Sequence, residues 1–230
     1  MSESRIILAL DTKEIQTAKS VIEKTRDYVG VYKLGLEFFL ANGIAGVKEI
    51  TTYNSDIQIF LDLKLHDIPN TVGAATSQVA NLKPLFLTVH ASGGSAMIKA
   101  AVANAPETKI TAVTILTSLS QQDMTEIGFS GSAEDRAIEL AKLATASGAK
   151  AIVCSPHEIS GIRAAIPADI SIITPGIRPK NTASSDDQKR IMDPKSALAA
   201  GANYLVIGRP ITSADNVAQA AKAILEESLS

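Results

Sequence analysis

The sequence contains few of the residues that build disulfides, metal clusters and base-stacking surfaces. Its 230 residues include one cysteine, no tryptophan and three histidines, and aromatic residues make up 4% of the chain. The single cysteine, Cys154, excludes an intrachain disulfide and a multi-cysteine zinc site. The shortage of aromatic rings argues against a surface on which nucleic-acid bases stack.

Long apolar runs and a strong excess of one charge are also missing. A formal net charge of −2 and a pI near 5.9 give no electrostatic reason to expect a nucleic acid or an anionic membrane as partner. No apolar run approaches the roughly 18 residues of a membrane span, and the apolar part of Met1–Asp11 is too short for a signal peptide. We therefore expect a soluble, cytoplasmic protein without nucleic-acid or membrane partners.

What is present is a regular alternation of short β-rich apolar runs with longer segments of helical periodicity. The predicted strands are Ile6–Asp11, Val31–Gly35, Gln58–Leu65, Leu85–Ala91, Lys109–Thr117, Ala149–Ser155, Ser171–Pro175 and Tyr204–Gly208. The clearest predicted helices are Ile15–Tyr28, Ser95–Asn104, Ala133–Ser147 and Asn216–Leu229. Roughly eight strand–helix units in a chain of this length predict an α/β fold of the (β/α)8 TIM-barrel type.

The main alternative fold is a doubly wound open sheet, but no GxGxxG motif follows the first strand to support it. No linker rich in Pro, Gly and Ser divides the chain, so we expect residues 1–230 to form one barrel domain. The most polar loop, KNTASSDDQK at Lys180–Lys189, lies between the seventh and eighth strands. It predicts a mobile lid at about residues 179–190.

The third predicted strand carries charge where a core strand would carry aliphatic residues. In FLDLKLHDIPNTV, from Phe60 to Val72, alternate residues of a strand point to opposite faces. One face is aliphatic and must be packed, while the other carries Asp62 and Lys64. Buried charges are costly unless paired, and they concentrate where chemistry occurs. The pattern is consistent with a structural ion pair or with a catalytic carboxylate–ammonium group.

Other polar residues gather at the same ends of the predicted strands. In a barrel, reactive groups sit at the carboxyl ends of the strands, and their joint placement there favours one large site. The strand-end candidates are Asp11, Lys33, Asp62, Lys64, Asp67, His90, Thr117, Ser118, Pro175, Gly176, Arg178, Gly208 and Arg209. The last two strand ends resemble a phosphate pocket, because glycines let the backbone approach closely and Arg209 offers a planar charged fork.

Several chemistries lack support in this set. The sequence has no HxH spacing for a transition metal, and the ammonium groups would compete with magnesium for the carboxylates. It has no nucleophile elbow or Ser–His–Asp motif. A Schiff base at Lys64 is disfavoured because neighbouring acids should keep this lysine protonated. A protonated lysine is suited to stabilising a developing carbanion and delivering a proton to it.

These residues carry a resemblance that extends over nearly the whole chain. FLDLKLHDIPNTV strongly resembles the signature of the orotidine 5′-phosphate decarboxylase family. The similarity continues in LALD at Asp11, YKLG at Lys33, TVHA at Ala91, LTS at Ser118, VCS at Val153–Ser155, TPGIRP at Thr174–Pro179, QKRIM at Gln188–Met192 and VIGRPIT at Val206–Thr212. The DxKxxD part is shared with a wider group of sugar-phosphate barrels, but its combination with IPNTV, TPGIRP and IGRPIT is highly specific.

The resemblance implies the conversion of orotidine 5′-monophosphate to UMP and CO2 in de novo pyrimidine biosynthesis, by a carboxy-lyase without metal or organic cofactor. It implies that Lys64 protonates C6, that Asp62 lies near the departing carboxylate and that Lys33 holds the charge network and contacts the ribose. It also implies a homodimer in which Asp67 and Thr71 enter the neighbouring site. The substrate-binding residues that it implies are Asp11, Lys33, Asp62, Thr71, Thr117, Ser118, Pro175, Arg178, Gln188, Gly208 and Arg209.

Two alternatives remain open from the sequence. One is a related metal-dependent sugar-phosphate decarboxylase or synthase of the same barrel group, because enzymes that share a fold often differ in reaction. The other is a non-catalytic protein that binds nucleotide phosphates, although a pure binder has no need for so much apposed charge.

Overall fold

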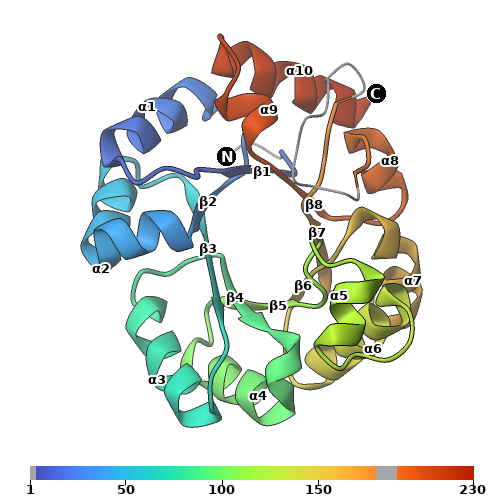
Figure 1. The fold of residues 1–230 in the computed structure, drawn as a ribbon. Coiled ribbons are helices and arrows are strands. Elements are labelled where there is room, and N and C mark those ends of the chain that lie inside the picture. Colours follow the sequence, from blue (N-terminus) through green and yellow to red (C-terminus); the bar gives the residue numbers. More distant parts are fainter. Residues whose placement is uncertain (1–3, 180–190) are drawn as a thin grey trace.

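The computed structural model describes residues 4–179 and 191–230, in which eight parallel strands close into one barrel (Figure 1). Each strand pairs with its neighbours in sequence, and β1 pairs with β8 to close the ring. This arrangement confirms the predicted (β/α)8 barrel. The strands are β1 (Ile6–Ala9), β2 (Val31–Gly35), β3 (Gln58–Leu65), β4 (Phe86–His90), β5 (Lys109–Val113), β6 (Ala151–Val153), β7 (Ser171–Thr174) and β8 (Tyr204–Ile207).

The helices form a ring outside the strands (Figure 1). They are α1 (Ile15–Thr25), α2 (Leu36–Tyr53), α3 (Pro69–Ala80), α4 (Gly94–Asn104), α5 (Gln121–Glu126), α6 (Ala133–Ala146), α7 (Ile159–Ala165), α8 (Pro194–Ala199), α9 (Arg209–Thr212) and α10 (Val217–Leu229), with short 3-10 turns η1 (Ala91–Gly93) and η2 (Pro156–Glu158). Among the helices that the structure describes, none has the length and apolarity that a membrane span requires.

The predicted limits of β2 and β3 match the observed ones, whereas several other strands are shorter than predicted. β6 is the clearest case, because it ends at Val153 although the apolar run continues through Cys154 and Ser155. Both of these residues are fully buried in the connection that follows the strand. Hydropathy reports burial, so it cannot separate the end of a strand from a buried loop.

The alternation predicted for β3 appears as two separate cores. Ile59, Leu61 and Leu63 face outward and pack against the helices, while Phe60 faces the interior of the barrel. The interior core contains one residue from each of six strands, namely Ile7, Val31, Phe60, Phe86, Ala151 and Ile173. Phe86 contacts Phe60 and Tyr204 edge to face, with ring centroids 5.6 and 5.3 Å apart. These aromatic rings fill the interior, so the barrel is packed rather than open.

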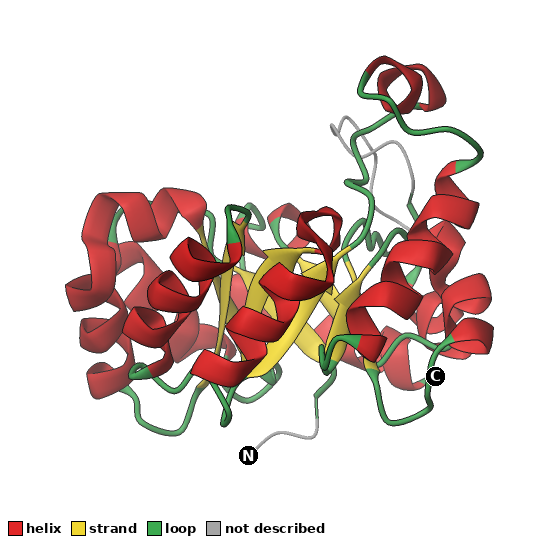
Figure 2. Ribbon diagram, turned by 90° about the horizontal axis from the view of Figure 1, so that it is seen from below, coloured by secondary structure: helices red, strands yellow, loops and turns green. Residues whose placement is uncertain are grey.

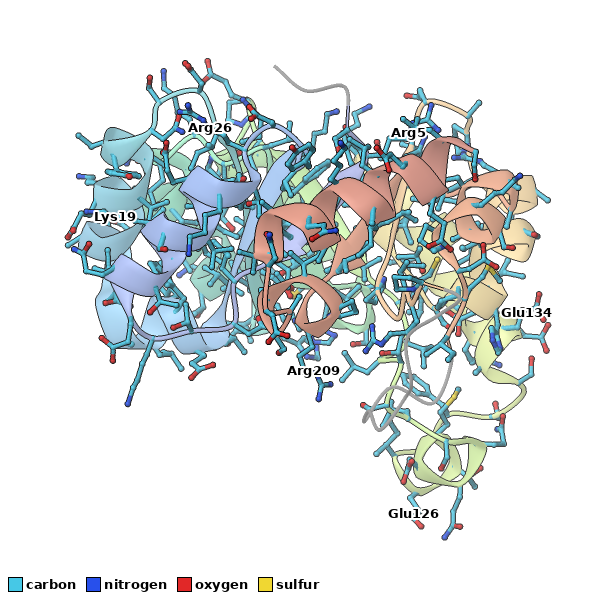
Figure 3. All side chains as sticks on the ribbon, turned by 90° about the horizontal axis from the view of Figure 1, so that it is seen from above. Arg5, Lys19, Arg26, Glu126, Glu134 and Arg209 are labelled. Carbon is cyan, nitrogen blue, oxygen red and sulfur yellow. The ribbon has the colours of Figure 1, made fainter. Side chains whose placement is uncertain are left out.

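The two mouths of the barrel differ in their surroundings. In the side view, the chain between β5 and α6 rises away from one mouth and carries α5, while the described N-terminal segment leaves from the opposite side (Figure 2). A hollow of about 940 Å³ at this amino-terminal mouth is bordered by Arg5 and Arg26. Figure 3 shows these two arginines on the side opposite to Arg209 and Glu126.

A side chain extends the short pairing between β7 and β8. The register of this pair contains only Ile173↔Tyr204 and Thr174↔Leu205. Asn203 extends the pairing, because its backbone N–H donates to the Ile172 carbonyl at 2.8 Å and its Oδ1 accepts from the Ile172 N–H at 2.7 Å. The amide side chain thus replaces a ladder hydrogen bond where the strands begin to pair.

We predict that Asn203→Ala lowers the free energy of unfolding by about 1–2 kcal/mol, because it leaves the Ile172 N–H without its acceptor. Urea unfolding followed by circular dichroism measures this change. Asn203→Asp is the matched control, since a carboxylate oxygen can accept the same hydrogen bond. Equal losses in the two variants would show that the acceptor is not what stabilises this position.

Candidate active site

A cavity of about 250 Å³ opens at the carboxyl ends of the strands. Its lining comes from β1, β2, β3, β5, β6 and β8 and from the segments that follow β1, β5, β7 and β8. The lining residues are Ala9, Asp11, Lys33, Phe60, Asp62, Lys64, Val113, Ile115, Leu116, Thr117, Val153, Pro175, Gly176, Arg178, Val206, Gly208 and Arg209. Part of the lining, which we call the aliphatic wall, consists of Ile115, Leu116, Val153 and Val206, while other parts are charged. The cavity therefore suits a ligand with an apolar part and an anionic part.

Four charged side chains form a continuous chain across the floor, which we call the charge array: Asp11, Lys33, Asp62 and Lys64. The Lys33 ammonium lies 3.3 Å from Asp11 Oδ1 and 3.4 Å from Asp62 Oδ2. The Lys64 ammonium lies 2.8 Å from the same Asp62 Oδ2. The Asp62 carboxylate is therefore shared between two cations.

Burial differs along the charge array. The side chain of Asp62 is 13% exposed, that of Lys64 is 31% exposed and that of Asp11 is 66% exposed. Burial by itself would raise the pKa of Asp62, but Lys33, Lys64 and a hydrogen bond from Thr88 together hold this pKa below its ordinary value of 3.8. Asp62 is therefore ionised at neutral pH, and the array keeps two ammonium groups in a partly desolvated space.

The backbone around Lys64 departs from a regular strand. The pairing of β3 with β4 runs through Leu61↔Leu87 and resumes at Leu65↔Val89, so four steps along β3 match two along β4. Within this bulge Lys64 has φ of +48°, a left-handed conformation that side chains with a Cβ rarely adopt. The bulge re-aims the Lys64 side chain toward Asp62, as bulges near active sites commonly do.

A threonine on β4 occupies the gap that the bulge leaves in the ladder. The backbone N–H of Lys64 donates to Thr88 Oγ1 at 2.8 Å, and the Thr88 hydroxyl donates to Asp62 Oδ1 at 3.0 Å. Thr88 is fully buried. The hydroxyl thus joins the backbone of one member of the charge array to the side chain of another.

Two glycines keep space open at the site. A Cβ at Gly35 would lie 3.2 Å from the Lys33 ammonium nitrogen and would crowd the ion pair that it makes. Gly176, after β7, has φ of +77°, which a residue with a side chain would adopt only with strain. Its carbonyl accepts from the Met192 N–H, and the Met192 carbonyl accepts from the Arg178 N–H, so the chain on either side of the undescribed segment is paired here.

The rim that follows β7 and β8 carries the positive charge predicted for a phosphate pocket. Arg178 and Arg209 both border the cavity, together with Gly176 and Gly208. Arg178 is held by a hydrogen bond from its guanidinium to the Ile177 carbonyl at 2.8 Å. Arg209 begins α9 and is exposed on the same side of the molecule as the α5 segment (Figure 3). Two guanidinium groups at one edge favour an anionic group of the ligand there.

Most of the predicted site residues lie together in this cavity, and a few lie elsewhere. The cavity includes Asp11, Lys33, Asp62, Lys64, Thr117, Pro175, Arg178, Gly208 and Arg209. Ser118 is exposed and lies outside the lining. Asp67 and Thr71 are also exposed and do not line the cavity, and Asp67 accepts a hydrogen bond from the N–H of Ile68. Gln188 and all of the predicted lid except Pro179 lie outside the described residues.

Sequence reasoning missed two parts of the site. The aliphatic wall, which includes Ile115, Leu116, Val153 and Val206, reads in the sequence as ordinary core strand. Thr88 reads as an ordinary β-branched strand residue. The sequence shows only that Thr88 lies two residues before His90, near the end of a strand. That position does not reveal whether its buried hydroxyl has hydrogen-bond partners.

Two histidines lie close to the charge array. The rings of His66 and His90 lie 5.3 Å apart. The pKa of His90 is lowered from 6.5, first by burial and then by the neighbouring His66 and Lys64. His90 is therefore neutral at pH 7. In residues 4–179 and 191–230 no three His, Cys, Asp or Glu side chains are grouped so as to hold a metal ion.

The chemical capacity of the site follows from its geometry. An ammonium group lies beside aliphatic side chains and is paired with a buried carboxylate at 2.8 Å. Such a group stabilises negative charge that develops on an atom beside it and can transfer a proton to that atom. The cationic rim lies at another edge of the same cavity and can anchor an anionic part of the ligand away from the reacting atom.

The chain is similar to known proteins in both sequence and structure. The profile of the "Orotidine 5'-phosphate decarboxylase / HUMPS family" matches residues 4–224. A Thermobifida fusca protein named orotidine 5′-phosphate decarboxylase is 47% identical over 222 residues, which cover 96% of this chain and 94% of that protein. The crystal structure of orotidine 5′-phosphate decarboxylase from Lactobacillus acidophilus superposes with a TM-score of 0.85 and 36% identity, covering 99% of this chain and 100% of that one. The chain belongs to the orotidine 5′-phosphate decarboxylase / HUMPS family.

Proposed function

We propose that this protein decarboxylates orotidine 5′-monophosphate to UMP and CO2, a step of de novo pyrimidine biosynthesis. The observation that carries the proposal is the Lys64 ammonium, which lies 2.8 Å from the buried Asp62 carboxylate in a cavity with an aliphatic wall and a cationic rim. The names of the curated relatives support the same activity over nearly the full length of the chain. We place the activity in a single barrel domain in the cytoplasm.

The proposed step breaks the bond between C6 of the pyrimidine and its carboxylate carbon. The electron pair of that bond stays on C6, in the plane of the ring where delocalisation is poor, and CO2 departs. The Lys64 ammonium stabilises this charge and then transfers one proton to C6, which gives UMP. Lys64 recovers its proton from water after release of the product.

The other members of the charge array support this step in different ways. Asp62 orients Lys64 and lies where the substrate carboxylate would approach, so repulsion between the two carboxylates is relieved when CO2 leaves. Lys33 forms ion pairs with both Asp11 and Asp62. Lys33 and Asp11 both line the cavity, where they would contact ribose hydroxyls. Thr117 and Pro175 border the part of the cavity that would receive the pyrimidine.

The phosphate is proposed to bind at the rim formed by Arg178, Gly208 and Arg209, with Gln188 from the predicted lid. The rim lies in the loops after the seventh and eighth strands, where barrels commonly bind phosphate. Binding energy gained there, away from the reacting carbon, is used to orient the ring over Lys64.

We propose that the reaction needs neither a metal nor an organic cofactor. Both Asp62 oxygens already have partners, since Oδ2 pairs with two ammonium groups and Oδ1 accepts from Thr88. A divalent cation would have to displace these cations from a carboxylate that is mostly buried. The arrangement supports the cofactor-independent activity over the metal-dependent sugar-phosphate enzymes of the same barrel group.

We also propose a homodimer in which Asp67 and Thr71 complete the site of the neighbouring subunit. Both side chains are exposed at the start of α3, and neither lines the cavity of its own subunit. Ile68, between them, is also 66% exposed. Covering this segment with a second subunit would bury Ile68 and bring an additional carboxylate to the site.

We predict that Lys64→Ala lowers kcat at least roughly a thousandfold, because it removes both the stabilising charge and the proton donor. The decrease in orotidine 5′-monophosphate absorbance, measured in EDTA, reports the activity. UMP should still bind in titration calorimetry, because its phosphate contacts remain.

Lys19→Ala is the matched control for this substitution. Lys19 forms a 2.7 Å ion pair with Glu49 on the surface, so its loss removes a similar pair far from the cavity. Turnover close to that of the parent in Lys64→Ala would contradict the role as proton donor. Activity that requires an added divalent metal would favour the metal-dependent alternative.

We predict that Arg209→Ala raises KM roughly tenfold to a hundredfold, because a charge-assisted contact to phosphate is lost. Initial rates over a range of substrate concentrations measure this change. Arg26→Ala is the control, because Arg26 lies at the opposite mouth of the barrel (Figure 3). A KM equal to that of the parent in Arg209→Ala would argue against the phosphate pocket.

Mixing of variants tests the proposed role of Asp67. Lys64→Ala and Asp67→Ala should each be inactive, yet a hybrid of the two has one site with a native Lys64 and a native Asp67 of the partner subunit. Random exchange of subunits should therefore restore roughly a quarter of the parent activity. If Asp67 acts within its own subunit, no hybrid site is intact and the mixture stays inactive.

A further inference from the structure

Thr88 is unusual among the buried polar residues because its hydroxyl contacts two members of the charge array at once. It accepts from the Lys64 N–H at 2.8 Å and donates to Asp62 Oδ1 at 3.0 Å. Its side chain is fully buried on β4, a position where valine would satisfy both strand propensity and packing. Burying a hydroxyl is unfavourable unless it is hydrogen-bonded, so these two contacts account for a polar atom in this position.

The contact from Thr88 to Lys64 stabilises an unfavourable backbone conformation of Lys64. Regular pairing of β3 with β4 stops at Leu61↔Leu87 and resumes at Leu65↔Val89. Lys64 lies within this interval at φ of +48°, a conformation that persists only when the surrounding structure stabilises it. The Thr88 hydroxyl supplies an acceptor for the Lys64 N–H where the ladder supplies none.

The contact to Asp62 assigns the two carboxylate oxygens to different partners. Oδ1 accepts from Thr88, so Oδ2 is left to face both the Lys33 and the Lys64 ammonium groups. Without the hydroxyl, the carboxylate can rotate and its pairing with the two lysines is no longer defined. One hydroxyl therefore sets the orientation of the Asp62 carboxylate and the direction in which the Lys64 side chain points.

We propose that Thr88 is a positioning residue that holds Lys64 and Asp62 in their reactive geometry through its hydroxyl. The inference rests on the proposed function of Lys64 as proton donor. Thr88 does not line the cavity, so it acts through the two residues that it holds and not through contact with substrate. A small displacement of a reacting group is enough to lower turnover strongly.

The test compares Thr88→Val, which keeps the shape and removes the hydroxyl, with Thr88→Ser, which keeps the hydroxyl. Thr88→Val should lower kcat roughly 10- to 100-fold, the effect of losing one hydrogen bond to a charged group. KM should change less than about threefold, because the phosphate rim is untouched. Thr88→Ser should stay within about threefold of the parent kcat. If Thr88→Val does not fold, Thr88→Cys keeps the size with a much weaker donor and should show the same loss of kcat.

Thr111→Val is the matched control. Thr111 is also a fully buried threonine, on the neighbouring strand β5, and its hydroxyl donates to the Lys109 carbonyl at 2.9 Å without touching the charge array. It should retain the parent kcat even if its melting temperature falls. Equal losses of kcat in Thr88→Val and Thr111→Val, or failure of serine to restore turnover, would overturn the positioning role.

A crystal structure of Thr88→Val separates this inference from the proposed function. Lys64 should leave the left-handed region or its ammonium should move away from Asp62. Unchanged positions of both residues would overturn the inference, whatever the activity. Absence of decarboxylation in the parent protein would instead refute the proposed function, while the structural comparison would still test what Thr88 holds.

Discussion

The site depends on a carboxylate that is mostly buried and yet remains charged. Asp62 is 13% exposed and would be protonated more readily for that reason, but Lys33, Lys64 and Thr88 stabilise its ionised form. The same contacts fix the two lysines, because each ammonium has an anionic partner inside the cavity. Removing Asp62 would leave the Lys64 ammonium without its carboxylate partner in a partly buried position, which is more costly than losing a surface pair.

The barrel tolerates these buried charges because the residues that stabilise the fold and the residues of the site lie in different parts of it. Phe60, Phe86 and Tyr204 fill the interior toward the amino ends of the strands, and the helices cover the outer face. The residues at the carboxyl ends are then free to be charged, because the apolar packing below and around them already holds the strands together. Asp62 lies only two residues beyond Phe60, so the change from packed core to reactive floor occurs within one step of the strand alternation.

The barrel and the charged face of β3 could be predicted from the sequence because both follow from the periodicity of apolar residues. The alternation in Gln58–Leu65 predicted both the outward aliphatic face and the inward charges, and the repeated strand–helix pattern predicted the barrel. Strand limits were less predictable where apolar runs continue into buried loops, as at Cys154. The aliphatic wall of the cavity was missed because valine and isoleucine have the same pattern whether they face a ligand or a core.

The bulge at Lys64 shows a different limit of sequence reasoning. A strand read with strict alternation places Lys64 on the face of Asp62, which is correct, but it gives no sign that the backbone reaches this geometry at φ of +48°. Lysine has no preference for that conformation, so the cause lies in a residue 24 positions away, where the Thr88 hydroxyl takes the place of a ladder acceptor. A strained conformation that depends on a distant side chain leaves no local pattern. Such a position is found only when each buried N–H and each buried hydroxyl is followed to its partner.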